Sequence, residues 1–289
     1  MVLTYLIVGD EPSYYNQAVF SILSALSKIT EEDTVVVLTD HPNQLKVLNS
    51  RILIISIDPD MIEEWKGDHH FFWRIKIEAL LHVASRFEGE DILYLDTDTV
   101  LYADLSPLKL VLNEGGNLMH TNEGALSKLA TKTERRMWEQ VKTKNYGSIS
   151  INQNDCMWNA GVVGISSKNI AQLTLALSIC DEMCADKVTR RLIEQLSLSL
   201  ALNSTIQLCV AEHVIGHYWS NKEQWESMIS LFVADCYQQC KPIEEQVQKV
   251  AQMNFNHLPI GLRIPNTQKR LKNIVARLFP DANPTFIKR

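Results

Sequence analysis

The stretch Asp91-Ile92-Leu93-Tyr94-Leu95-Asp96-Thr97-Asp98 is a continuous apolar run that ends in two carboxylates. Such a run is typical of a central strand in a parallel sheet, because that strand is buried on both faces. In open parallel sheets, ligands bind beyond the carboxyl ends of the strands. The pattern therefore predicts an α/β fold in which Asp96 and Asp98 stand at the functional edge of the sheet.

The sequence on either side of this strand alternates short apolar runs with helical patterns, which indicates βαβ units and a mostly parallel sheet flanked by helices. Strands are expected at residues 3–8, 35–38, 51–57, 162–165 and 205–210, and helices after the first strand and at 72–87, 168–185 and 189–202. We see no internal repeat and no Pro/Gly/Ser-rich linker. We therefore expect one compact domain over residues 1–262, followed by an appendage over residues 263–289.

The composition is that of a globular protein of a size common among enzymes, with 46% hydrophobic and 21% charged residues in a chain of 289. The N-terminus lacks the basic region of a signal peptide, and no run of 18 apolar residues occurs. We therefore expect a cytoplasmic protein, in which the six cysteines remain reduced.

The formal charge of −6 is unevenly distributed. Residues 263–289 carry seven basic side chains against Asp281 alone, a net charge of +6, which leaves −12 for residues 1–262. An acidic body argues against general nucleic-acid binding by the main domain. We expect no nucleic-acid partner.

The Asp-x-Asp pair suits a reaction in which a diphosphate leaves a sugar, because two carboxylates can hold the Mg²⁺ or Mn²⁺ that neutralises the departing charge. Acids with this spacing also occur as ordinary solvated turn residues. Here they follow an apolar strand and are followed by Val100 and Leu101, so they interrupt what could have been core. This context favours a site.

Several further segments, in this order, resemble glycosyltransferase family 8 and its relatives. They are Trp73-Arg74-Ile75-Lys76-Ile77, the run from Ile92 to Val100, Asp104-Leu105-Ser106-Pro107-Leu108, Trp158-Asn159-Ala160-Gly161-Val162, Glu194-Gln195 and His217-Tyr218-Trp219-Ser220-Asn221-Lys222. The resemblance covers roughly residues 4–225. It implies a GT-A fold, a nucleotide-sugar donor that is usually UDP-linked, a Mn²⁺ or Mg²⁺ ion, and transfer with retention of configuration.

The resemblance also implies roles for particular residues. It assigns the metal to Asp96, Asp98 and His217. It places Lys222 at the donor phosphates, and Asp10 and Asp40 at the nucleoside. Arg74 and Lys76 are two residues apart and cannot share one helix face, so at most one of them points at the donor, and the family pattern favours Arg74.

On the side of the transferred sugar, the resemblance implies that Asn159 lies beside the sugar and that Gly161 permits its close approach. Gln195 would face the anomeric carbon, with Glu194 next to it as a catalytic candidate or a helix-surface acid. An amide is a poor nucleophile, so we expect Gln195 to stabilise an oxocarbenium-like species through its carbonyl dipole. The acceptor, a glycan or a lipid-linked saccharide, is not defined by these residues.

Two other functions compete with this interpretation. A sugar nucleotidyltransferase would need a glycine-rich phosphate loop after the first strand, whereas Gly9-Asp10-Glu11-Pro12 is acidic and contains one glycine. A catalytically silent module that binds a nucleotide sugar or a partner would keep the same motifs. Hydrolysis of the donor in the presence of Mn²⁺ distinguishes the enzyme from such a module.

The appendage has an apolar face formed at helical spacing by Leu271, Ile274, Val275, Leu278 and Phe279, and it is rich in basic residues. One hypothesis is a helix that docks on the acidic body. The other is an amphipathic helix that holds the enzyme at the inner face of an anionic membrane, where a lipid-linked acceptor would be presented.

Overall fold

The central sheet determines the architecture of the protein. The computed structural model describes residues 1–255, 260, 267, 271, 274, 275, 277 and 278. The sheet has seven strands in the order β12-β6-β11-β4-β1-β2-β3. Their bounds are β1 Val2–Ile7, β2 Thr34–Thr39, β3 Leu53–Ser56, β4 Ile92–Leu95, β6 Asn117–Met119, β11 Val162–Ile165 and β12 Cys209–Val210. β11 runs antiparallel to β4 and β6, and the other strands share one direction. The predicted α/β fold with a mostly parallel sheet is confirmed.

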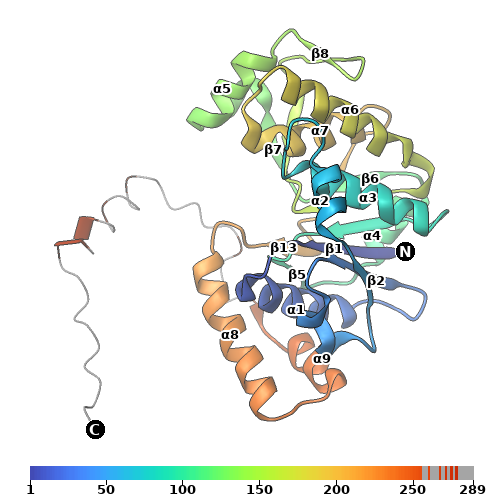
Figure 1. The fold of residues 1–289 in the computed structure, drawn as a ribbon, viewed down its shortest axis with the longest axis vertical. Coiled ribbons are helices and arrows are strands. Elements are labelled where there is room, and N and C mark those ends of the chain that lie inside the picture. The colour runs from blue at the N-terminus through green and yellow to red at the C-terminus, as the bar shows by residue number, and fades with distance from the viewer. Residues whose placement is uncertain (256–259, 261–266, 268–270, 272–273, 276, 279–289) are drawn as a thin grey trace.

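Helices cover both faces of the sheet (Figure 1). α1, α8 and α9 lie on one side, and α3, α6 and α7 lie on the other. The helix bounds are α1 Pro12–Leu26, α2 Pro59–Trp65, α3 Arg74–Arg86, α4 Ser106–Asn113, α5 Lys132–Val141, α6 Ala171–Ala185, α7 Ile193–Leu202, α8 Lys222–Gln238 and α9 Ile243–Ala251. The short 3-10 helices are η1 Pro42–Leu48, η2 Leu126–Lys128, η3 Ser167–Asn169 and η4 Arg190–Leu192.

The two helical layers explain why the β4 segment is apolar throughout. Ile92 and Tyr94 belong to the hydrophobic cluster on one face, and Leu93 and Leu95 belong to the cluster on the other. All four side chains are buried. Because successive side chains of a strand point to opposite faces, a strand between two helical layers has no polar side.

Three two-stranded antiparallel ribbons were not anticipated from the sequence. They are β5 Thr99–Leu101 with β13 Ile215–His217, β7 Asn122–Ala125 with β10 Cys156–Trp158, and β8 Asn145–Tyr146 with β9 Ile149–Ser150. Strands of two to four residues are too short to show clear alternation, which is the sequence signal of a half-buried strand. Two of these ribbons build the site described below.

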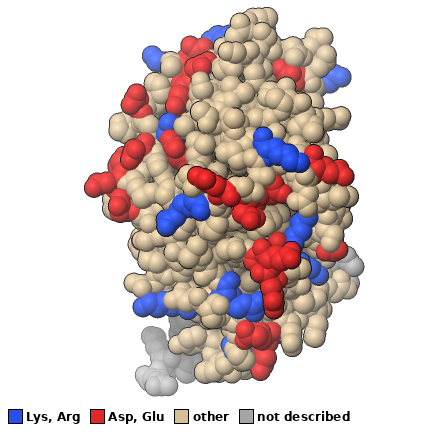
Figure 2. Space-filling model, turned by 90° about the vertical axis from the view of Figure 1, so that its right-hand side faces the viewer, with Lys and Arg blue, Asp and Glu red and all other residues tan. Residues whose placement is uncertain are grey.

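The surface of the described part is mixed in charge. Figure 2 shows acidic and basic side chains interspersed on the face that it presents, without one continuous basic surface. Of the helices in the described ranges, none has the length and apolar character to cross a membrane. Most of the appendage at 263–289, including Phe279, lies outside the described residues.

Candidate metal and donor site

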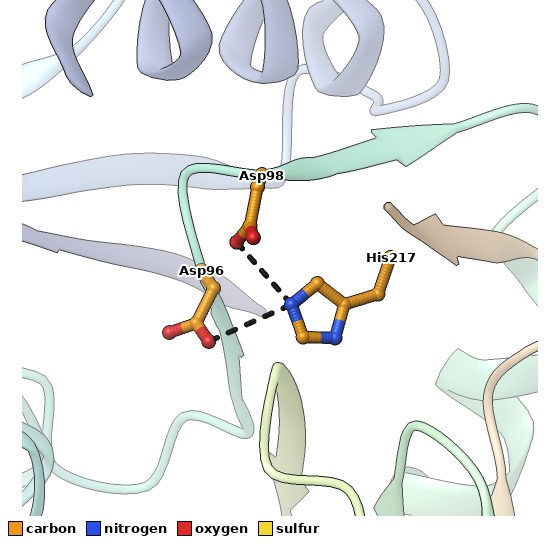
Figure 3. Close-up of side chains that lie close together, drawn as sticks. All are labelled: Asp96, Asp98 and His217. Carbon is orange, nitrogen blue, oxygen red and sulfur yellow. Dashed lines mark ion pairs between the residues drawn. The ribbon is translucent and has the colours of Figure 1, made fainter. Parts of the chain in front are cut away.

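Asp96, Asp98 and His217 form one cluster at the carboxyl end of β4 (Figure 3). The Nε2 atom of His217 lies 3.2 Å from Oδ1 of Asp98 and 3.9 Å from Oδ2 of Asp96. Among the residues that the structure describes, this is the single group of three or more acidic, histidine or cysteine ligands that could hold a metal ion. The three residues that the resemblance assigns to the metal are thus brought together.

The β5–β13 ribbon places His217 beside the two aspartates. His217 pairs with Thr99, and the N–H of Tyr218 donates to the carbonyl of Asp98 at 3.1 Å. The Tyr218 ring stacks on Trp225 of α8 with 4.4 Å between centroids. The strand that carries His217 is therefore held by backbone pairing on one side and aromatic packing on the other.

The donor set is suitable for Mn²⁺ or Mg²⁺, because it combines two carboxylates with one imidazole and leaves other positions open. Adjacent ligand atoms in an octahedral shell of Mg²⁺, each about 2.1 Å from the ion, lie about 3 Å apart. The distances of 3.2 and 3.9 Å around His217 are close to that separation. The residues therefore fit a divalent ion after small side-chain shifts.

The orientation of the His217 ring is defined by Asn159. Oδ1 of Asn159 accepts a hydrogen bond from the N–H of Gly161 at 3.0 Å and lies 2.8 Å from Nδ1 of His217. Because that oxygen is an acceptor, Nδ1 carries a hydrogen and Nε2 is the ring nitrogen that can bind the ion. An outer contact that sets the tautomer in this way is a common feature of histidine metal ligands.

Asp98 is buried between His217 and the ammonium group of Lys222. Burial by itself would raise the pKa of Asp98, but the neighbouring His217 and Lys222 hold it well below its ordinary value. Nζ of Lys222, at the start of α8, lies 2.8 Å from Oδ2 of Asp98. Lys222 thus lies at the cluster of Asp96, Asp98 and His217.

Asp96 is held by a buried lysine that the sequence did not assign. Nζ of Lys76 lies 3.2 Å from Oδ1 of Asp96 and 3.2 Å from Oε1 of Glu194, and the Tyr94 hydroxyl donates to the same Asp96 oxygen at 2.9 Å. Oδ1 is therefore occupied, and Oδ2 faces His217. Burial opposes the charge of Lys76, but the two carboxylates raise its pKa above the ordinary value.

Arg74, expected at the donor, makes its contacts elsewhere. Its guanidinium donates to both carboxylate oxygens of Asp181, to Glu78 and to the carbonyl of Trp65. Lys76 lies in the site in its place. At most one of the two is expected to point at the donor, with Arg74 favoured; in the structure it is Lys76 that contacts Asp96.

A signal for Lys76 was present in the sequence. Lys76, Leu80 and Val83 are spaced i, i+4 and i+7 on α3, and all three are buried. A lysine on the apolar stripe of a helix must find a partner inside the protein, because a buried unpaired charge is costly. Arg74 is equally buried, but the residue four positions on is Glu78, with which it pairs, rather than an apolar residue.

Gly161 permits a close approach, but the neighbour that comes close is His217. A Cβ built at Gly161 would lie 2.1 Å from the Cε1 and Nδ1 atoms of the imidazole. The carbonyl of Gly161 also accepts the N–H of Asp96 at 2.9 Å. The absence of a side chain at Gly161 thus allows the His217 ring and the backbone of Asp96 to lie close together at the end of β4.

Asp10 and Asp40 follow the carboxyl ends of β1, which is next to β4, and of β2, which is next to β1. Both carboxylate oxygens of Asp40 accept from the N–H of Gly9, at 3.0 and 3.1 Å. Gly9 has a φ of +99°, a conformation that favours glycine. Asp10 is exposed beside it. Both residues are thus on the same sheet edge as the metal cluster.

A network of amides and carboxylates lies next to His217. Asn159 donates through Nδ2 to Oε1 of Glu123 at 3.3 Å, and Gln195 donates through Nε2 to Oε2 of Glu123 at 2.9 Å. Glu194 is buried and turns toward Lys76, and burial raises its pKa above the ordinary value. Sequence reasoning missed Glu123, which stands on the short strand β7.

Comparisons with known proteins find similarity to solved structures alone. No family model matches the sequence, and no curated protein matches it. Similar solved structures include a galactosyltransferase, LgtC, in complex with donor and acceptor sugar analogs, with 13% identity, a TM-score of 0.48, and 72% of this chain and 73% of that chain covered. The apo WbbM bifunctional glycosyltransferase has 12% identity and a TM-score of 0.48, with 72% of this chain and 38% of that chain covered. Apo mouse xyloside xylosyltransferase 1 has 11% identity and a TM-score of 0.48, with 73% of this chain and 85% of that chain covered. At such identities and TM-scores no activity transfers to this chain, so its function is argued from the site.

Proposed function

We propose that the protein is a metal-dependent glycosyltransferase of the GT-A type, which moves a hexose from a nucleotide sugar, UDP-linked by expectation, to a glycan or lipid-linked acceptor. The observation that carries this proposal is the convergence of Asp96, Asp98 and His217 at the carboxyl edge of a parallel sheet. Ligands bind at that edge in open α/β sheets, and the donor set suits a divalent ion.

Different residues of the chain would contact different parts of the nucleotide-sugar donor. Asp96, Asp98 and His217 would hold Mn²⁺ or Mg²⁺, which when bound neutralises the charge on a leaving diphosphate. Lys222, already at the cluster, would exchange its contact with Asp98 for one with a donor phosphate. Asp10 and Asp40, on neighbouring strand ends, would hold the nucleoside.

The transferred sugar would lie against Asn159 and Gln195. Both amides contact Glu123, and Asn159 also contacts His217, so the sugar side and the metal side form one hydrogen-bonded unit. With retention of configuration, the carbonyl dipole of Gln195 would stabilise positive charge at the anomeric carbon. Glu194 would act indirectly, by holding Lys76 against Asp96.

A thermal-shift panel of nucleotide sugars with and without Mn²⁺ tests the proposal. A donor at about 100 times its dissociation constant stabilises the folded state by about 2.7 kcal/mol, which corresponds to a rise in melting temperature of roughly 5 °C. The rise should require Mn²⁺ and be absent in Asp98→Asn. Mn²⁺-dependent hydrolysis of the same donor then distinguishes an enzyme from a silent binding module. A panel without any metal-dependent shift would overturn the proposal.

We further propose that the appendage brings the enzyme to an anionic membrane surface. Leu271, Ile274, Val275 and Leu278 are helical where described, and their exposed fractions lie between 48% and 68%. Apolar side chains on one helical face beside basic residues suit the interface of an anionic bilayer. A lipid-linked acceptor and a cytoplasmic location belong to the same proposal.

A further inference from the structure

Glu123 contacts both amides that face the sugar side of the site. It stands on β7, which pairs with β10, and the backbone of Asn159 is hydrogen-bonded to His120 and Thr121, the two residues just before β7. α7, which carries Gln195, is joined to β10 through Ser199, whose Oγ accepts from the N–H of Trp158. Three elements thus converge on one carboxylate.

The contacts of Glu123 define which end of each amide is free. A carboxylate accepts hydrogen bonds, so each amide must present its NH₂ group to Glu123. Nε2 of Gln195 donates to Oε2 of Glu123 at 2.9 Å, which leaves Oε1 of Gln195 directed away from Glu123. Nδ2 of Asn159 donates to Oε1 of Glu123 at 3.3 Å, and Oδ1 of Asn159 then faces the N–H of Gly161 and Nδ1 of His217.

The two amides depend on Glu123 to different degrees. Asn159 has further partners that require the same orientation, since the N–H of Gly161 and Nδ1 of His217 both meet its oxygen. For the Gln195 side-chain amide, by contrast, Glu123 is the one hydrogen-bond partner within the described part of the chain. Loss of Glu123 should therefore release Gln195 and leave the metal ligand His217 largely in place.

We propose that Glu123 is a positioning residue that sets the polarity of the Gln195 amide, so that its carbonyl end rather than its NH₂ end is offered to the transferring sugar. This inference rests on the proposed function. A carbonyl dipole directed at the anomeric carbon stabilises the positive charge of an oxocarbenium-like species, whereas a reversed amide would oppose it.

The test compares Glu123→Gln, Glu123→Ala and Glu123→Asp. A glutamine at this position brings one oxygen and one NH₂ group, so one neighbouring amide must turn over. Asn159 is held in place by Gly161 and His217, and Gln195 is the one that turns. We expect donor turnover with Mn²⁺ to fall about 10–100-fold in Glu123→Gln and Glu123→Ala, with UDP–Mn²⁺ affinity changed less than about threefold. Glu123→Asp keeps the carboxylate and should recover part of the turnover.

Glu182→Gln is the matched control. Glu182 is an exposed carboxylate on α6 that accepts from the N–H of Gly147 and the hydroxyl of Ser178. It should retain full turnover.

A double-mutant cycle gives the decisive comparison. In a Gln195→Ala background, Glu123→Gln should cause less than about a twofold further loss of turnover, because Glu123 and Gln195 act as one unit. A loss of the same size in both backgrounds would overturn the inference, as would full turnover in Glu123→Gln.

A second measurement is independent of activity. The side-chain NH₂ resonances of Gln195, assigned by their absence in Gln195→Ala, should show a hydrogen-bonded proton protected from solvent exchange. Glu123→Gln should abolish that protection while the backbone spectrum is retained. A wild-type protein without donor turnover would refute the proposed function and not this contact, whereas unprotected Gln195 protons in the wild type would refute the contact itself.

Discussion

Nε2 of His217 lies 3.2 Å from Oδ1 of Asp98. His217 is the last residue of β13, and Asp98 directly precedes β5, the strand with which β13 pairs. Nδ1 of the same ring meets Oδ1 of Asn159 at 2.8 Å. The imidazole thus faces the two aspartates with one nitrogen and Asn159 with the other. Substitutions around this ring should separate the two functions.

Asp96→Asn and Asp98→Asn should each abolish metal-dependent donor binding and leave the fold intact. An amide keeps the shape of the side chain but removes the anionic ligand that the ion requires. Isothermal titration with UDP in the presence of Mn²⁺ measures the affinity, and far-UV circular dichroism checks the fold. Unchanged affinity in both variants would refute the metal assignment.

His217→Ala should weaken the complex less than the loss of either aspartate, because water can replace one neutral ligand. The effect should be largest at limiting Mn²⁺ and decline as Mn²⁺ is raised. Donor turnover measured across a Mn²⁺ series provides the comparison. Wild-type turnover at limiting Mn²⁺ would show that His217 does not bind the ion.

Lys76→Met should destabilise the protein by about 3–5 kcal/mol, because it leaves the buried carboxylate of Glu194 without its cation. Lys76→Met combined with Glu194→Gln removes both charges and should recover much of that loss. Urea unfolding of wild type, the single variants and the double variant gives the free energies. If the double variant is no more stable than Lys76→Met, the two charges are not coupled.

His120 should make the protein less stable in mild acid. Burial, aided by the nearby His217, lowers the pKa of His120 from 6.5 to about 4. Between pH 6.5 and 4 the unfolded chain binds the proton and the folded chain does not, so stability falls with falling pH, by about 3 kcal/mol over the window. His120→Gln can keep the hydrogen bond to the carbonyl of Ile215.

Urea unfolding at pH 7 and pH 4.5 measures this contribution as a difference between wild type and His120→Gln, since other groups titrate in both proteins. The wild type should lose the larger share of its stability on acidification. Parallel losses in the two proteins would show that His120 does not remain neutral when folded.

The appendage should bind anionic vesicles. Near such a surface each Lys or Arg contributes about 1 kcal/mol, so a few basic groups together with the apolar face suffice for reversible binding. Co-sedimentation with anionic and neutral vesicles at low salt measures it. Full-length protein that stays in the supernatant with anionic vesicles, or vesicle binding left unchanged by deletion of residues 263–289, would refute the membrane hypothesis.

Much of the fold could be predicted because its signals are local. The apolar run at 92–95 coincides with β4, and the run at 162–165 coincides with β11. Their continuous burial follows from helices on both faces of the sheet, a condition that the repeated strand and helix patterns already required. The short ribbons were missed because they carry little periodicity of their own, and they are stabilised by the elements around them.

The sequence by itself determined where the carboxylates of the site stand, because Asp96 and Asp98 follow directly from the end of β4 and share its edge of the sheet. Only the tertiary structure decided which side chains meet them. The turn of α3 brings Lys76 rather than Arg74 to Asp96, and the β7–β10 ribbon brings Glu123 between Asn159 and Gln195. The physical reason is that strand and helix patterns arise from neighbours along the chain, whereas a hydrogen bond between distant residues depends on how the elements pack.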